Sequence, residues 1–356
     1  MLRVKEGIPQ PESVNPNALK NIKKIKRKDY TVDEYVEGII SGNRVVLSKA
    51  ITLVESLLPK HNKIAQDIIE KCMPYSGNSF RIGVTGVPGA GKSTFIESFG
   101  YYLTSLGHKV AVLAIDPSST RTKGSILGDK TRMERLSVQK DAFIRPSPSA
   151  GTLGGVAKKT HEIIFLCEAA GFDIVLVETV GVGQSEIAAH SMVDFFLLVL
   201  IAGAGDELQG IKRGIMEMAD SIIINKADGD NVNKAKLAAQ SYTNALHLFP
   251  PTDSTWVPKV LTCSAMYDNG IKEIWNMLQE YEALTKKNGY FEQKRALQAL
   301  TVMFSTIEGN LKNSFYNNEH VNNALADIKK SVLSGKMTSY AAAAKLISIA
   351  DKTNNK

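Results

Sequence analysis

The sequence contains few cysteines, and those present form no recognisable pattern. The three cysteines, Cys72, Cys167 and Cys263, have no paired spacing. A disulfide framework or a structural zinc site needs such spacing, so neither is predicted. The six histidines form no ligand-spaced pair either. A reducing compartment therefore suits this chain.

The chain also lacks a long apolar segment and a strong excess of charge. Its longest apolar stretch, FFLLVLIAGAG from Phe195, is about half the length that spans a bilayer. The first 30 residues carry no apolar signal core, and Glu6, Glu12 and Asp29 argue against a transit peptide. A formal net charge of +7 over 356 residues is mild, and the basic residues are mostly dispersed. We therefore expect a cytoplasmic protein without a membrane or nucleic-acid partner.

Three segments of different composition follow one another along the chain. Residues 1–78 are predicted to be helical, because apolar residues recur at helical spacing from Thr31 to Cys72. In residues 79–288 short β-rich runs alternate with helical stretches, and in residues 289–356 only helices are predicted. The predicted strands are FRIGVTG, KVAVLAID, DAFIRP, FDIVLVET, DFFLLVLI, DSIIINK and WVPKVLTCS. This alternation predicts an α/β fold with a doubly wound, mainly parallel sheet between N-terminal and C-terminal helical extensions.

The first predicted strand ends in a glycine-rich loop that is typical of phosphate binding. The segment GVPGAGKS satisfies the pattern G-x-x-x-x-G-K-[ST]. Its glycines let the backbone wrap around phosphate oxygens, and the helix that follows adds its positive N-terminal end. Lys92 is placed to bridge the β- and γ-phosphates of a nucleotide, and the Ser93 hydroxyl to bind Mg²⁺. The predicted phosphate-binding residues are Gly86, Val87, Pro88, Gly89, Ala90, Gly91, Lys92, Ser93 and Thr94.

Asp116 offers an alternative interpretation of the glycine-rich loop. It ends the second predicted strand, where a dinucleotide-binding fold keeps its ribose-binding acid. That fold has no use for the Gly-Lys-Ser triplet, so a nucleoside triphosphate site is the favoured interpretation.

A second motif indicates which base is bound. Asn225, Lys226 and Asp228 form the pattern N-K-x-D at the end of the strand DSIIINK. A carboxylate at Asp228 can accept two hydrogen bonds from guanine, whereas adenine would leave it unpaired, and such charge-assisted bonds contribute roughly 1.5–3 kcal/mol each. Ser264 and Ala265, after the last predicted strand, could supply a backbone N–H to the guanine carbonyl oxygen. Together with the phosphate loop, this pattern favours GTP over ATP.

Acidic residues near the predicted nucleotide suggest a magnesium site. Asp116 and Glu178 end predicted strands, and Asp129 lies in the long loop after Asp116. Mg²⁺ prefers carboxylates, hydroxyls and water, so Ser93 with some of these acids suffices. Each acid taken singly is also compatible with a turn or capping role.

Other loop residues are candidates for catalysis. Gly181 could sense the γ-phosphate through its N–H, Gln184 could orient water, and Arg121 could act as an internal arginine finger. Lys212 lies in the polar loop GDELQGIKRG, directly after the most apolar strand, and could reach the nucleotide when a partner docks. An exposed position on the following helix is the alternative for Lys212. The sequence identifies no general base.

In order and spacing, six segments resemble the methylmalonyl-CoA mutase-associated GTPases of the MeaB/ArgK type. They are GVPGAGKST, AIDPSS, GDKTRM, ETVGVGQSE, GDELQGIKRGIMEMAD and NKAD, and the resemblance covers roughly Gly42 to Ile349. It implies an α/β G domain, a homodimer made by C-terminal helices, and protection and reloading of an adenosylcobalamin-dependent methylmalonyl-CoA mutase. Cobalamin and the mutase rest on this resemblance alone.

The resemblance also assigns roles to particular residues. Lys92 and Ser93 take the phosphate-loop roles, and Asp116, Asp129 and Glu178 take magnesium and catalytic roles. The segment from Asp206 to Lys212 would be a switch coupled to the partner.

Two other functions remain open on the sequence alone. One is a related GTPase that matures another metalloenzyme, such as a nickel enzyme, although no His-rich or Cys-rich tract supports it. The other is a P-loop kinase, against which the segment NKAD argues because it disfavours ATP. For the helices after Tyr290, packing on their own G domain is the alternative to dimerisation.

Overall fold

The structure is a computed structural model that describes residues 30–116, 133–148, 153–179, 185–203, 213–250 and 252–354. Three helices open it: α2 (Val32–Ile40), α3 (Arg44–Glu55) and α4 (Pro59–Cys72), followed by the short η1 (Met73–Tyr75). Thr31 caps α2 in a capping box with Glu34, and the Asn43 side chain accepts from two backbone N–H groups at the start of α3. The helical periodicity predicted from Thr31 to Cys72 is thus confirmed.

A parallel sheet of seven strands forms the centre of the molecule, in the order β3-β2-β4-β1-β5-β6-β7. The chain runs from β1 outward to β2 and β3, returns to β4 beside β1, and then continues on the other side. Ligands of such sheets bind where the strand order reverses, at the carboxyl ends of the strands. The strands are β1 (Phe80–Gly86), β2 (Val110–Asp116), β3 (Ala142–Pro148), β4 (Ile174–Thr179), β5 (Phe195–Ile201), β6 (Ser221–Asn225) and β7 (Lys259–Thr262).

Helices cover both faces of the sheet, which explains the nearly continuous apolar strands. Along β5, Leu197 and Val199 belong to the core under one set of helices, whereas Leu198 and Leu200 belong to the core under another. The first set contains α5 (Lys92–Ser105), α7 (Glu134–Ser137) and α12 (Ile271–Lys287). The opposite face carries α8 (Leu153–Ala169), α9 (Ser185–His190), α10 (Arg213–Met218) and α11 (Val232–Leu246). The short η2 (Gly229–Asn231) and η3 (Ala265–Tyr267) follow β6 and β7.

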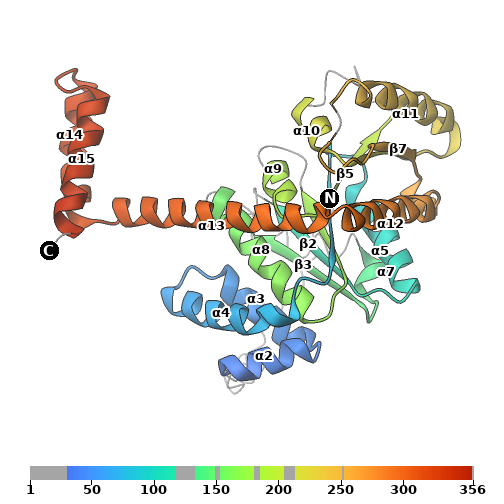
Figure 1. The fold of residues 1–356 in the computed structure, drawn as a ribbon, viewed down its shortest axis with the longest axis horizontal. Helices are drawn as coiled ribbons and strands as arrows, with labels where there is room; N and C mark the ends of the chain where they lie inside the picture. The colour runs from blue at the N-terminus through green and yellow to red at the C-terminus, as the bar shows by residue number, and fades with distance from the viewer. Residues whose placement is uncertain are drawn as a thin grey trace, which may run out of the picture.

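The N-terminal helices share a core with the sheet. Buried residues of α2, α3 and α4 pack with α8 and with the face of β2 that carries Leu113 and Ile115. In Figure 1 these three helices lie beside α8. The predicted doubly wound fold with helical extensions is confirmed, while the domain boundaries after residues 78 and 288 stay predictions.

The C-terminal helices begin on the body and then leave it. Helix α13 (Tyr290–Tyr316) extends from the body and carries α14 (Glu319–Leu333) and α15 (Ser339–Asn354) as a hairpin at its far end (Figure 1). Its first turns are anchored, since Phe291 is buried in the core and the Arg295 guanidinium donates to both carboxylate oxygens of Asp194 at 2.7 Å. No helix in the described part of the chain is long and apolar enough to cross a membrane.

Candidate nucleotide-binding site

The glycine-rich loop leaves the carboxyl end of β1 and leads directly into α5. Gly86 has a φ of 146°, and a Cβ there would lie 1.9 Å from the Val199 carbonyl oxygen of neighbouring β5. Gly89 and Gly91 have φ values of 82° and 84°, in the left-handed region that glycine adopts without strain. Gly91 forms the N-cap of α5, so the free N–H groups of the first turn face the loop. The predicted strand, loop and helix therefore have the form that phosphate binding requires.

Lys92 lies inside this loop and is 8% exposed. Its Nζ donates to the carbonyl oxygens of Gly86 at 2.9 Å and Val87 at 3.2 Å. Burial lowers the pKa of the Lys92 ammonium, and the carboxylates of Glu178 and Glu186 oppose that shift. A buried cation at the centre of the loop is the group expected to meet the phosphates.

Ser93 and Glu178 meet at the mouth of the loop. The Ser93 hydroxyl donates to a carboxylate oxygen of Glu178 at 2.7 Å. In the sheet, Glu178 of β4 is in register with Val84 of β1 and Ala114 of β2. A hydroxyl and a carboxylate oxygen in contact are oxygen donors of the kind that Mg²⁺ takes, so this pair fits the predicted magnesium site.

Asp116 ends β2 one position beyond Ile115, which is in register with Thr179 of β4. Its backbone is therefore at the same edge of the sheet as Glu178. The described residues contain no group of three His, Cys, Asp or Glu side chains arranged to hold a metal ion, and the Asp116 side chain is not among those described.

Asn225 connects the base motif to the phosphate loop. Its side chain is buried at 2% exposure, and its Nδ2 donates to the Ala90 carbonyl at 2.9 Å. Its Oδ1 accepts from the Ala265 N–H at 3.1 Å and from the Cys263 thiol at 3.4 Å. One side chain thus holds the phosphate loop, the end of β6 and the loop after β7 together.

Lys226 and Asp228 follow Asn225 at the same edge. Lys226 has a φ of 59°, and its Cε lies 3.9 Å from the position that a Cβ on Gly91 would take. The aliphatic part of Lys226 therefore runs beside the phosphate loop. The Ser264 hydroxyl donates to Asp228 Oδ2, so Asp228 faces the loop after β7.

The backbone N–H groups of Ser264 and Ala265 have partners within the protein. Ser264 N–H donates to the Asn269 carbonyl at 3.0 Å, and Ala265 N–H donates to Asn225. A donation from either group to guanine would require an exchange of partner, so this assignment stays a prediction. The Ser264 hydroxyl that reaches Asp228 was not expected from the sequence.

Glu186 is a site residue that motif reasoning missed. It lies in the first turn of α9, is 2% exposed, and its charge acts on Lys92. The sequence did contain a signal for Glu186: it is the last residue of the glycine-rich segment ETVGVGQSE and lies at the start of a helix. A buried hydroxyl pair below the loop was also missed: Thr179 Oγ1 donates to Thr85 Oγ1 at 2.9 Å.

Several predicted residues lie outside the described part of the chain. They are Arg121, Asp129, Gly181, Gln184 and Lys212. The structure thus brings together the phosphate loop, Glu178 and the base motif.

Residues 47–320 match the model of the family described as methylmalonyl Co-A mutase-associated GTPase MeaB. The chain is similar to the GTPase ArgK of Escherichia coli strain K12, with 48% identity over 81% of this chain and 87% of that protein. It is 44% identical to the mitochondrial methylmalonic aciduria type A homolog of Mus musculus, over 86% of this chain and 76% of that protein. A crystal structure titled LAO/AO transport system kinase covers 91% of this chain and 98% of its own, with 38% identity and a TM-score of 0.72.

Replacing Lys92 tests the phosphate site. We expect Lys92→Ala to lower kcat/KM for GTP hydrolysis by at least about a hundredfold, because the buried ammonium can no longer meet the phosphates. The variant should remain folded, since the hydrogen bonds of Lys92 in the described part of the chain go to loop carbonyls and not to the core. Hydrolysis at the parent rate would show that the phosphates bind elsewhere.

Replacing Asp228 tests the base site. We expect Asp228→Asn to weaken GTP binding by roughly 10-fold or more, through loss of charge-assisted hydrogen bonds, and to favour XTP. Xanthine has a carbonyl where guanine has its amino group, and an amide can donate to it. Competition binding measures the preference, with exposed Asp230→Asn on the same loop as the matched control. An unchanged preference for GTP in Asp228→Asn contradicts the assignment.

Proposed function

The chain belongs to the MeaB family of methylmalonyl Co-A mutase-associated GTPases, and on that basis we propose that it protects and reloads an adenosylcobalamin-dependent methylmalonyl-CoA mutase. The chain is a GTPase, as its relatives are named. The observation that carries the proposal is the match to a family whose name joins a GTPase to this mutase. The cytoplasmic location stays a prediction.

GTP binding and hydrolysis would use residues of three loops. Lys92 would leave the carbonyls of Gly86 and Val87 and donate to the β- and γ-phosphates. Asp228 would accept the two hydrogen bonds of guanine, in a loop that Asn225 already holds against the phosphate loop.

Ser93 and Glu178 would hold Mg²⁺, with Asp116 and Asp129 as further candidates. When bound, the ion neutralises charge on the phosphates. Gly181 is proposed to sense the γ-phosphate, and Gln184 to orient the attacking water.

We further propose that the protein is a homodimer. Beyond its anchored turns, α13 carries apolar side chains at spacings of three and four residues that are between 46% and 65% exposed: Leu297, Leu300, Phe304, Ile307 and Leu311. A continuous apolar stripe on one face of a helix normally meets another surface. A second copy of the same arm would supply a matching stripe, as in isologous dimers.

Substitutions on this stripe test the dimer. We expect Phe304→Glu with Leu311→Glu to halve the mass measured by light scattering, because buried charges without partners oppose association. GTP affinity should not change. A cut after Lys287 is less informative, because it also removes buried Phe291 and the Arg295 anchor.

The matched control is Lys312→Glu. Lys312 is exposed on the same turns of α13 but lies outside the stripe, so this substitution should leave the dimer intact. A double variant that remains dimeric would contradict the proposed interface.

Mixing the protein with a methylmalonyl-CoA mutase tests the partner. We expect the mutase to accelerate GTP hydrolysis and Lys212→Ala to remove most of this acceleration, because a cation stabilises charge developing on the transferred phosphoryl group. GTP affinity should be nearly unchanged, since binding reports the ground state and acceleration the transition state.

Acceleration at full strength in Lys212→Ala would remove this residue from the mechanism, and no acceleration by the mutase would contradict the partner. The same mixtures, supplied with γ-labelled GTP, separate hydrolysis from kinase activity. Label appearing in free phosphate supports a GTPase, whereas label in protein or a small molecule supports a kinase.

A further inference from the structure

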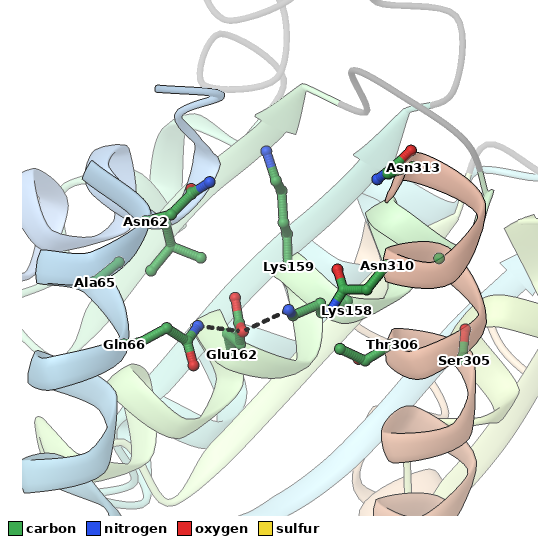
Figure 2. A pocket seen from close by; sticks show the side chains of 12 residues that line it. Asn62, Ala65, Gln66, Lys158, Lys159, Glu162, Ser305, Thr306, Asn310 and Asn313 are labelled. Carbon is green, nitrogen blue, oxygen red and sulfur yellow. Dashed lines mark hydrogen bonds and ion pairs between the residues drawn. The ribbon is translucent and has the colours of Figure 1, made fainter. Parts of the chain in front are cut away.

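A cleft of about 440 Å³, lined by both polar and apolar groups, lies between α4, α8 and α13, three helices from separate parts of the chain. Figure 2 shows side chains from all three helices around it. Its lining consists of Val54, Asn62, Ala65, Gln66, Lys158, Lys159, Glu162, Ser305, Thr306, Gly309, Asn310 and Asn313. Clefts of this size hold small-molecule ligands.

Helix α13 turns its polar face toward this cleft. Thr306, Asn310 and Asn313 line it, whereas Phe304, Ile307 and Leu311 lie on the opposite side of the helix and are exposed. An amphipathic helix on a protein surface normally packs its apolar face inward. The reversed orientation places polar residues of α13, and not its exposed apolar stripe, at the cleft.

Many polar groups around the cleft are available to a ligand. The side chains of Asn62, Ser305, Thr306, Asn310 and Asn313 form no hydrogen bond with another residue in the described part of the chain. They combine amide and hydroxyl groups, which bind hydroxylated or carbonyl-bearing molecules.

The charges of the lining leave one positive charge in excess. Glu162 accepts from the Gln66 amide at 2.7 Å, and its Oε1 lies 3.9 Å from the Lys158 ammonium (Figure 2). Lys159 donates to the Glu55 carbonyl at 2.7 Å. Burial raises the pKa of Glu162 and lowers that of Lys159. The Lys158 ammonium is more than a hydrogen-bond length from its carboxylate, so it retains donors for an anion.

Gly309 keeps the α13 side of the cleft open. A Cβ built on it would meet no atom within 4 Å, although glycine is one of the least favourable residues in a helix interior. A larger side chain there would therefore occupy the cleft without displacing the backbone.

We propose that this cleft binds a small hydroxylated anion, whose carboxylate or phosphate pairs with Lys158 and whose hydroxyl groups meet the amides and hydroxyls of α4 and α13. The ligand would join the N-terminal helices, the G domain and the second half of α13. This site is separate from the phosphate loop and from the proposed dimer stripe.

Binding of glycerate, glycerol 3-phosphate and glycerol to the full-length protein tests the proposal. The titrations are made with saturating GDP and Mg²⁺, so that the phosphate loop is already occupied. We expect at least one of the two anions to bind saturably, with one site per chain, and at least tenfold tighter than neutral glycerol. Hydrogen exchange should slow in residues 305–313 and 158–162.

Two variants locate the site. Gly309→Leu, which fills the cleft, and Lys158→Gln, which removes its charge, should each weaken anion binding at least tenfold. Ser314→Leu places the same side chain on an exposed position of α13 outside the lining and should bind like the parent. Unchanged melting temperatures and GTPase rates show that the variants are folded.

Three results would overturn the proposal. One is the absence of saturable binding for both anions. Another is parent-like anion binding by Gly309→Leu. The third is anion binding that slows hydrogen exchange only around residues 86–93. A preference for glycerate or for glycerol 3-phosphate identifies whether the ligand carries a carboxylate or a phosphate.

Discussion

The contact between Asn225 and the phosphate loop is the constraint on which the nucleotide site depends. The Asn225 amide lies so close that a Cβ on Gly91 would be 2.7 Å from its Nδ2. Glycine at 91 and asparagine at 225 are therefore required together. Removing a partner from a buried hydrogen bond costs about 1–3 kcal/mol. Loss of the Asn225 side chain would also separate the two loops that must bind opposite ends of one nucleotide.

The strand order of the sheet places these loops next to one another. Strand β1 lies between β4 and β5, so the loop after Gly86 has Glu178 on one side and the Val199 carbonyl on the other. Both faces of these strands are buried, which fixes their register. The Ser93–Glu178 hydrogen bond then results from two strand ends that are adjacent in space but distant in sequence. Pre-organisation of this kind lowers the cost of ordering the site when GTP binds.

The elements that could be predicted from the sequence are those that local residue patterns determine. The strands, the phosphate loop and the three helices from Thr31 to Cys72 follow from periodicity and from residues with special backbone freedom, such as Gly86. Glu186 was missed because its burial beside Lys92 depends on how α9 packs, which no spacing encodes. The partners of the Ser264 and Ala265 N–H groups likewise depend on a loop that folds back through Asn269.

The orientation of α13 could not be predicted for a related reason. Periodicity identifies an amphipathic helix, and the usual rule would turn its apolar face toward the body. The rule does not hold here because Arg295 fixes the rotation of the helix: its guanidinium donates to Asp194 and to the carbonyls of Gly77 and Ser79. Arg81 of β1 adds a further polar contact nearby, because its guanidinium donates to both carboxylate oxygens of Glu168. Because charged groups fix the first turns of α13, the exposed apolar stripe farther along this helix is free to meet another molecule.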